Sequence, residues 1–329
     1  MKMDKNNIET QEIILDKIEK INIEISKLQN TQEKLFKKYD FLLNEQLDNN
    51  KNLYKILQQL LLKDLLSSYK NEIDNFLSEK NISSKEEDSD MLFIKGGTYK
   101  PSFLNKEKKV TDLYVSKYQV TQDKWKKYMK IDPSKFKQEK RPVENITWIS
   151  SLKFCNKISE HFGLQPVYKI ETDKLIKIIY KTGEEINPNE ADFSKTEGYR
   201  LPTEVEWEWF AKGGENKNSN FKYSGGENIE EVGWYSKNSN GHSEIVGTKK
   251  PNDLQLYDCT GNVWEWCYDT TNENILNEKS YLYEENSLSK RIRGGSWCDS
   301  EPYCLITYRA SSSSYSYNIG FRIVRTVNK

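Results

Sequence analysis

Glycine, proline and tryptophan are confined to one part of this chain, and this segregation limits the fold more than any other feature of the sequence. All 16 glycines, all 8 prolines and all 8 tryptophans lie at or beyond Gly96. A segment without glycine or proline can form long helices, whereas the remainder contains the residues that make turns. The sequence therefore predicts a helical region over residues 1–77, a charged linker over 78–90 and a compact domain over 91–329.

Apolar residues in the N-terminal region recur at alternating spacings of four and three, which is the a/d seam of a left-handed coiled coil. The seam comprises Ile14, Ile18, Ile21, Ile25, Leu28, Gln32, Leu35, Tyr39, Leu42 and Gln46. After Leu53 the apolar face widens, as in a helix buried in a bundle. A helical hairpin, a higher oligomer and a single helix packed on its own globular domain are all compatible with this pattern. We expect residues 8–66 to mediate self-association or to bind a helical partner.

The overall charge and the cysteine pattern exclude several classes of protein. The formal net charge is zero and the pI is about 6.8, so no global field favours nucleic acid or an anionic membrane. The sequence contains neither an apolar signal segment nor a run of about 18 apolar residues. The five cysteines include no Cys-x-x-Cys pair, which argues against a disulfide framework and a zinc ribbon. We expect a cytoplasmic protein with free thiols and with neither nucleic-acid nor membrane partners.

Two helices in the compact domain are marked by capping residues. Thr203 and Glu206 have the spacing of a capping box, so a helix is expected to begin after Thr203. A second helix is predicted over about residues 149–162, with Thr147 as its N-cap and Gly163 at its end. Short β-rich runs and long polar loops surround both helices, which indicates a mixed domain.

The eleven residues from Leu256 to Trp266 combine two tryptophans, two acidic residues and a glycine. They show neither a helical nor an alternating apolar period, so we expect an irregular segment. One interpretation is a core loop held in place by Trp264 and Trp266. The other is a cation-binding loop, because hard cations such as calcium prefer several oxygen ligands. This second interpretation assigns the ligands to Asp258, Gly261, Val263 and Glu265.

Seven short motifs follow one another in the compact domain. They are Gly96-Gly97-Thr98, Val120-Thr121, Pro142 to Trp148, Arg200 to Trp209, Gly261 to Trp266, Arg293 to Trp297 and Gly320-Phe321-Arg322. Their order resembles the formylglycine-generating enzyme, or sulfatase-modifying factor, domain over about residues 91–326. The resemblance implies an α+β fold of the C-type lectin type, with a small mixed sheet, helices and much ordered loop. It also implies a structural calcium ion at the four residues of the cation-binding interpretation.

Active members of that family oxidise a substrate cysteine to formylglycine, with copper held by two cysteine thiolates. Cys304 stands at the place of the second thiolate, but Asp299 occupies the place of the first and Cys298 lies one residue earlier. A shift of one residue turns a side chain to the opposite face of a strand. We therefore expect a protein without this catalysis. The alternative is a copper-dependent formylglycine-generating oxidase that uses Cys304, Cys298, Ser296 and Trp264.

Of the two C-terminal segments 298–304 and 310–318, the second is dominated by serine, tyrosine and asparagine. Such residues suit recognition, because tyrosine gives a large contact area and serine and asparagine give adaptable hydrogen bonds; a solvated low-complexity loop is the simpler interpretation. The arrangement resembles the ligand-binding face of variable proteins diversified by retroelements. This resemblance implies a protein-binding face, which the coiled coil would make multivalent. The face would comprise Trp297, Asp299, Tyr303, Tyr308, Ser312, Ser314, Tyr315, Tyr317 and Asn318.

Overall fold

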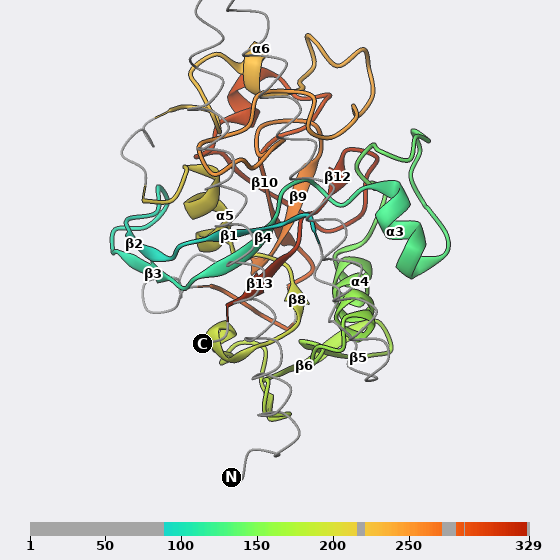
Figure 1. Cartoon of the computed structure of the whole chain (residues 1–329), viewed down its shortest axis with the longest axis vertical. Coiled ribbons are helices and arrows are strands. Elements are labelled where there is room, and N and C mark those ends of the chain that lie inside the picture. The colour runs from blue at the N-terminus through green and yellow to red at the C-terminus, as the bar shows by residue number, and fades with distance from the viewer. Residues whose placement is uncertain (1–88, 216–220, 272–280, 286, 328–329) are drawn as a thin grey trace, which may run out of the picture. The chain divides into compact units, whose positions relative to one another are not determined.

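The computed structural model describes residues 89–215, 221–271, 281–285 and 287–327 (Figure 1). The predicted coiled coil over residues 8–66 lies outside the described residues, as do the predicted helical region and most of the predicted linker. Within the described ranges, strands and short helices alternate with long loops, which confirms the α+β class. No helix in these ranges is long and apolar enough to cross a membrane.

The first four-stranded sheet joins the two ends of the described domain. Its order is β1 (Met91–Ile94), β4 (Leu113–Ser116), β13 (Val324–Thr326) and β8 (Tyr199–Arg200). Strand β13 follows the last sequence motif and pairs antiparallel with both β4 and β8. The C-terminal end of the domain is therefore part of the sheet that its first residues begin.

The second four-stranded sheet supports the C-terminal loops. Its order is β11 (Arg309–Ser312), β10 (Lys290–Arg293), β9 (Trp264–Thr270) and β12 (Ile319–Gly320). Strand β12 runs parallel to β9, whereas β10 is antiparallel to both β9 and β11. The two segments predicted to bind a ligand connect β10 to β11 and β11 to β12, so one sheet holds the ends of both.

Strand β9 corrects the prediction that the segment ending at Trp266 is irregular throughout, because the strand begins at Trp264. Trp264, Trp266 and Tyr268 belong to one hydrophobic core, and Cys267 belongs to the other. All seven residues of β9 are buried. A strand buried on both faces lacks the alternation of apolar and polar residues that marks a strand in a sequence.

The two predicted helices begin at their predicted caps. In α4 (Trp148–His161), the backbone N–H of Ser150 donates to Oγ1 of Thr147. In α5 (Glu204–Ala211), both hydrogen bonds of the capping box are present. Helix α5 is buried along its whole length and packs against β9 and β10. The buried carboxylates of its first turn pair with arginines, Glu204 with Arg293 of β10 and Glu206 with Arg200 of β8.

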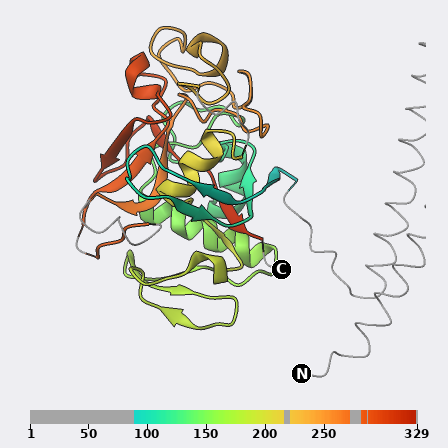
Figure 2. The same ribbon diagram turned by 90° about the vertical axis from the view of Figure 1, so that its left-hand side faces the viewer.

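The smaller elements lie around the two sheets. Helix α3 (Gln122–Met129) stacks Trp125 on Phe154 of α4, with ring centroids 5.4 Å apart. Helix α6 (Ile229–Val232) lies in loops at one end of the domain, and the β5–β6 hairpin lies at the other (Figures 1 and 2). The remaining elements are β2 (Gly97–Tyr99), β3 (Lys108–Val110), β5 (Tyr168–Glu171), β6 (Lys174–Ile179), β7 (Glu185–Ile186) and the 3-10 helices η1 (Phe193–Lys195) and η3 (Glu301–Cys304).

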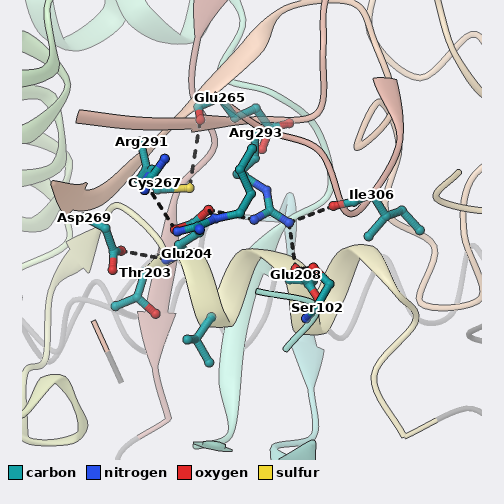
Figure 3. A network of polar contacts seen from close by, with 12 residues as sticks. Ser102, Thr203, Glu204, Glu208, Glu265, Cys267, Asp269, Arg291, Arg293 and Ile306 are labelled. Atoms are coloured by element: carbon teal, nitrogen blue, oxygen red, sulfur yellow. Dashed lines mark hydrogen bonds and ion pairs between the residues drawn. The ribbon is translucent and has the colours of Figure 1, made fainter. Parts of the chain in front are cut away.

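A cluster of fully buried charges links α5 to β10 (Figure 3). Nη1 of Arg293 donates to Glu204 (2.7 Å), and Nη2 donates to Glu208 (2.8 Å) and to the carbonyl of Ile306 (2.7 Å). Burial by itself raises the pKa of Glu204, but Arg309 and Arg293 hold it below its ordinary value. The carboxylate therefore stays charged, and its charge is compensated.

We expect Arg293→Met to lower the free energy of unfolding by about 3–5 kcal/mol, because Glu208 and Glu204 would then be buried with fewer partners. Urea denaturation measures the loss. The control is Lys169→Met, which removes an exposed ion pair with Glu185 and should leave the denaturation midpoint nearly unchanged. Equal midpoints for the Arg293 variant and the wild type would contradict a stabilising role for the buried cluster.

Candidate functional site

The motif from Arg293 to Ser296 turns the chain out of β10 into the C-terminal loops. Gly294 and Gly295 have φ angles of 96° and 76°, a region that side chains disfavour. A Cβ atom on Gly295 would lie 2.5 Å from Sγ of Cys304, so only glycine fits there. The two glycines therefore hold the first loop closely against Cys304.

A polar cluster lies at the base of these loops. Oδ2 of Asp299 accepts hydrogen bonds from Nε1 of Trp264 (2.8 Å) and from the hydroxyl of Ser296. Nδ2 of Asn318 donates to Oγ of Ser296 (3.2 Å) and to Sγ of Cys298 (3.3 Å). The structure thus brings together residues from β9, from the loop after β10 and from the segment before β12.

Aromatic rings extend from this cluster toward solvent. The ring of Tyr308 lies 6.1 Å from that of Trp264, and the ring of Tyr303 lies 5.0 Å from Tyr308 in an edge-to-face arrangement. Tyr303 is 42% exposed, whereas Trp264 is 5% exposed. The three rings therefore form a wall that is buried at Trp264 and open to solvent at Tyr303.

A second aromatic group surrounds Trp297. Its ring meets Phe136 edge to face at 5.3 Å and lies 5.9 Å from Tyr317. The ammonium of Lys135 lies 4.4 Å from the centre of the Tyr317 ring, within the range of a cation–π contact. Trp297 is only 8% exposed, so it packs beneath the predicted ligand-binding face and presents little surface.

The other predicted ligand residues differ in exposure. Tyr315 and Tyr317 are 57% and 43% exposed. Ser314 is also exposed, while Ser312 is half-buried and donates a hydrogen bond to the carbonyl of Ser314 (2.7 Å). Tyrosines therefore provide most of the large side-chain surface on these loops.

Lys135 and Phe136 carry no signal in the sequence, because they lie more than 150 residues before Trp297 and Tyr317, whose rings they contact. The carboxylate of Glu144 accepts hydrogen bonds from both backbone N–H groups, at 2.6 and 2.9 Å. Burial outweighs the opposing effect of the two N–H groups and raises the pKa of Glu144 to about 7. Glu144 belongs to a motif found in the sequence, but the loop that it holds is visible only in the fold.

The two cysteines of the possible oxidase site have different surroundings. Cys304 is fully buried in a cluster with Tyr223 and Tyr235, and burial, with a contribution from Asp299, raises the pKa of its thiol to about 12. Cys298 is exposed and contacts Ser296 and Asn318. Copper(I) binds deprotonated sulfurs, so an ion at this site would have to displace the proton of the buried Cys304 thiol.

The residues predicted to bind calcium meet at the side chain of Gln119. Its Nε2 donates to the carbonyls of Asp258 (3.1 Å) and Val263 (2.8 Å) and to Oε1 of Glu265 (3.0 Å). Gly261 forms the turn between them, with φ 75°. Three of the four predicted residues therefore direct oxygens toward one point, where an amide nitrogen lies.

The carboxylates of this loop have other partners. Arg322 donates to both oxygens of Glu265 (2.7 Å each), and Oδ2 of Asp258 accepts from the N–H of Gly247 (2.7 Å). Burial raises the pKa of Asp258 to about 6. Among the described residues, Oδ1 of Asp258 and Oε1 of Gln119 are buried without a hydrogen bond. The donor chemistry suits calcium, but an ion would have to displace the Gln119 amide, and calcium binding stays a prediction.

Comparison with known proteins places this domain among its relatives. Residues 78–327 match the family model described as the sulfatase-modifying factor enzyme 1-like domain. The chaperone protein LppX of Paenibacillus barcinonensis is 33% identical over 267 residues, 72% of this chain and 89% of that protein. The formylglycine-generating enzyme of Streptomyces coelicolor is 30% identical over 152 residues, 40% of this chain and 48% of the enzyme. The match thus spans about half of the enzyme's length.

Solved structures share the fold. Variable protein 1 of Treponema denticola superposes with a TM-score of 0.59 and 29% identity, over 72% of this chain and 95% of that chain. The structure of CarF superposes with a TM-score of 0.55 and 23% identity, over 73% of this chain and 98% of that chain, and supports the fold alone. These likenesses confirm the predicted formylglycine-generating-enzyme-type, C-type lectin-like domain.

We expect calcium to raise the melting temperature of Gln119→Ala more than that of the wild type, because the variant leaves three oxygens without the amide that now binds them. At 100 times its dissociation constant, an ion stabilises a protein by about 2.7 kcal/mol, which is about 5–10 °C for a domain of this size. Melting curves in calcium and in a chelator measure the difference. The control is Asp258→Asn in the same background, which should reduce the shift. Identical curves for Gln119→Ala with and without calcium would refute the calcium site.

Proposed function

We propose that this chain, which belongs to the sulfatase-modifying factor enzyme 1-like domain family, is a non-catalytic protein whose C-terminal loops bind a protein ligand. The observation that carries the proposal is the gathering of exposed tyrosines on these loops. Tyr303, Tyr315 and Tyr317 are 42–57% exposed, on segments whose ends are fixed by β10, β11 and β12. Exposed tyrosines on a rigid support bind protein surfaces with little loss of side-chain entropy.

The relatives support a protein as the ligand. One is a chaperone, and the name of another is that of a variable protein. We further propose that a retroelement varies the sequence of these loops. Residues 8–66 would mediate self-association or bind a helical partner, which would make the protein multivalent. Sedimentation velocity of the full chain tests self-association, and a single species with the 38.8 kDa mass of one chain would exclude it.

The chemistry of Cys304 supports the absence of catalysis. Burial raises the pKa of this thiol to about 12, so a metal ion would have to displace its proton on binding, which opposes thiolate coordination. Asp299 lies beside it and is hydrogen bonded to Ser296 and Trp264, the residues that the oxidase alternative requires. A carboxylate is a hard ligand, which suits copper(I) less well than a second thiolate.

We expect the triple variant Tyr303→Ala, Tyr315→Ala, Tyr317→Ala to lose its protein ligand. Immobilised full-length chains would be exposed to soluble protein from the source cells, and retained proteins quantified by mass spectrometry. A partner bound by the wild type should fall at least tenfold with the triple variant, which is about 1.4 kcal/mol. Phe93→Ala is the matched control, because Phe93 is 54% exposed on β1, away from the loops. Retention of no protein, or of the same proteins by all variants, would refute the proposal.

Incubation with copper(I), oxygen and a cysteine-containing peptide should produce no aldehyde. The thiol of Cys304 has a raised pKa, and Asp299 stands at the place of the first family thiolate. Mass spectrometry after labelling with a hydroxylamine reagent detects any aldehyde. The Asp299→Cys variant is the informative comparison, since it restores a cysteine at the place of the first thiolate of the family pattern. Aldehyde formation by the wild-type chain would overturn the non-catalytic assignment.

A further inference from the structure

Asp299, Trp264, Tyr303 and Tyr308 form a corner of the C-terminal face, here called the Asp299 corner. Trp264 and Ser296 donate to the same carboxylate oxygen, Oδ2, which fixes the orientation of the carboxylate. Tyr308 lies against Trp264, and Tyr303 lies edge to face against Tyr308. The corner therefore joins an anchored carboxylate to an aromatic wall that opens to solvent at Tyr303.

The charge of the Asp299 corner is not balanced by neighbouring cations. Within the described ranges, no lysine or arginine forms an ion pair with Asp299 or with Glu301, and Glu301 accepts a hydrogen bond from Tyr223 (2.7 Å). The charges of Asp299 and Glu301 both raise the pKa of the thiol of Cys304, beyond the larger effect of its burial. Two carboxylates thus make the local potential negative on a face that is otherwise tyrosine-rich.

A carboxylate beside aromatic rings is suited to a cation. Guanidinium groups stack on aromatic faces and donate to carboxylates at the same time, whereas ammonium groups act as compact point charges. Oδ1 of Asp299 has no hydrogen bond to any of the described residues. An arginine side chain could therefore donate to Oδ1 while its plane rests on Tyr303 or Tyr308.

We propose that the Asp299 corner binds an arginine side chain of the protein ligand, an inference that rests on the proposed function. The carboxylate that occupies the place of a family cysteine becomes the charged part of a recognition site. The aromatic wall supplies stacking and excludes water from one side of the contact. The competing explanation is that Asp299 only holds Trp264 and Ser296 in position.

The test uses the full chain labelled with 5-fluorotryptophan and a probe peptide, acetyl-Gly-Ser-Arg-Ser-Gly-amide. A matched peptide has citrulline, which keeps the shape of arginine and lacks its charge. Fluorine NMR follows the Trp264 resonance, assigned from Trp264→Phe. We expect the arginine peptide to shift this resonance with at least fivefold higher affinity than the citrulline peptide. Equal affinities for the two peptides would overturn the proposal.

Variants separate recognition from support. Asp299→Asn keeps an oxygen that can accept from Trp264 and removes the charge, so it should abolish the preference for arginine over citrulline while the melting temperature stays near that of the wild type. Tyr303→Ala should weaken binding of both peptides, because it removes stacking. Asp253→Asn removes an exposed charge elsewhere and should change neither affinity. Retention of the arginine preference by Asp299→Asn would assign Asp299 a supporting role alone.

The two proposals fail in different ways. Capture of a protein partner that depends on the exposed tyrosines, together with no preference for arginine, would leave the binding function standing and remove only the Asp299 corner as an arginine site. Loss of both the partner and the arginine preference would remove both.

Discussion

Buried pairs of arginine and glutamate are the interactions on which the rest of this domain depends. Removing two charges from water is costly, and their attraction offsets the cost only when the geometry is good and the remaining polar atoms have partners. Arg322 meets this condition with both oxygens of Glu265. Arg293 binds Glu204 and Glu208 through its two Nη atoms, while its buried Nε has no hydrogen bond to the described residues. Each pair joins distant parts of the chain, so the pairs form only when the sheets and α5 have assembled.

These pairs also show that residues of the family motifs are needed for the fold itself. The arginines of the Arg293 and Arg322 motifs, and the glutamates at the start of α5 and in β9, are partners in the buried network. Their removal would disturb the fold whatever the loops do. The cysteine positions lie in the loops above this network, where Asp299 forms hydrogen bonds with Trp264 and Ser296 without disturbing it. The buried charged residues that stabilise the fold are therefore distinct from the loop residues at the cysteine positions.

The loop predicted to bind calcium directs its oxygens toward a side-chain amide in this fold. Asp258, Val263 and Glu265 do converge, as the oxygen-ligand interpretation requires, yet the atom at their meeting point is the amide nitrogen of Gln119. An amide N–H₂ group satisfies several acceptors, and Arg322 neutralises Glu265. A distant glutamine thus donates to the same oxygens that are predicted to bind the cation, which the sequence of the loop does not reveal.

The sequence by itself determined the features that depend on residues close together along the chain. The caps at Thr147 and Thr203, the helices that follow them and the α+β class were all predictable, because capping acts over three or four residues. The tertiary structure alone decided the features that rest on distant contacts. Strand β9 shows no alternation of apolar and polar residues, because both of its faces are buried. Phe136 contacts Trp297, because Glu144 binds the backbone of the loop that carries Phe136. Local backbone preferences depend on consecutive residues, whereas burial and long-range pairing arise only when separate segments of the chain pack together.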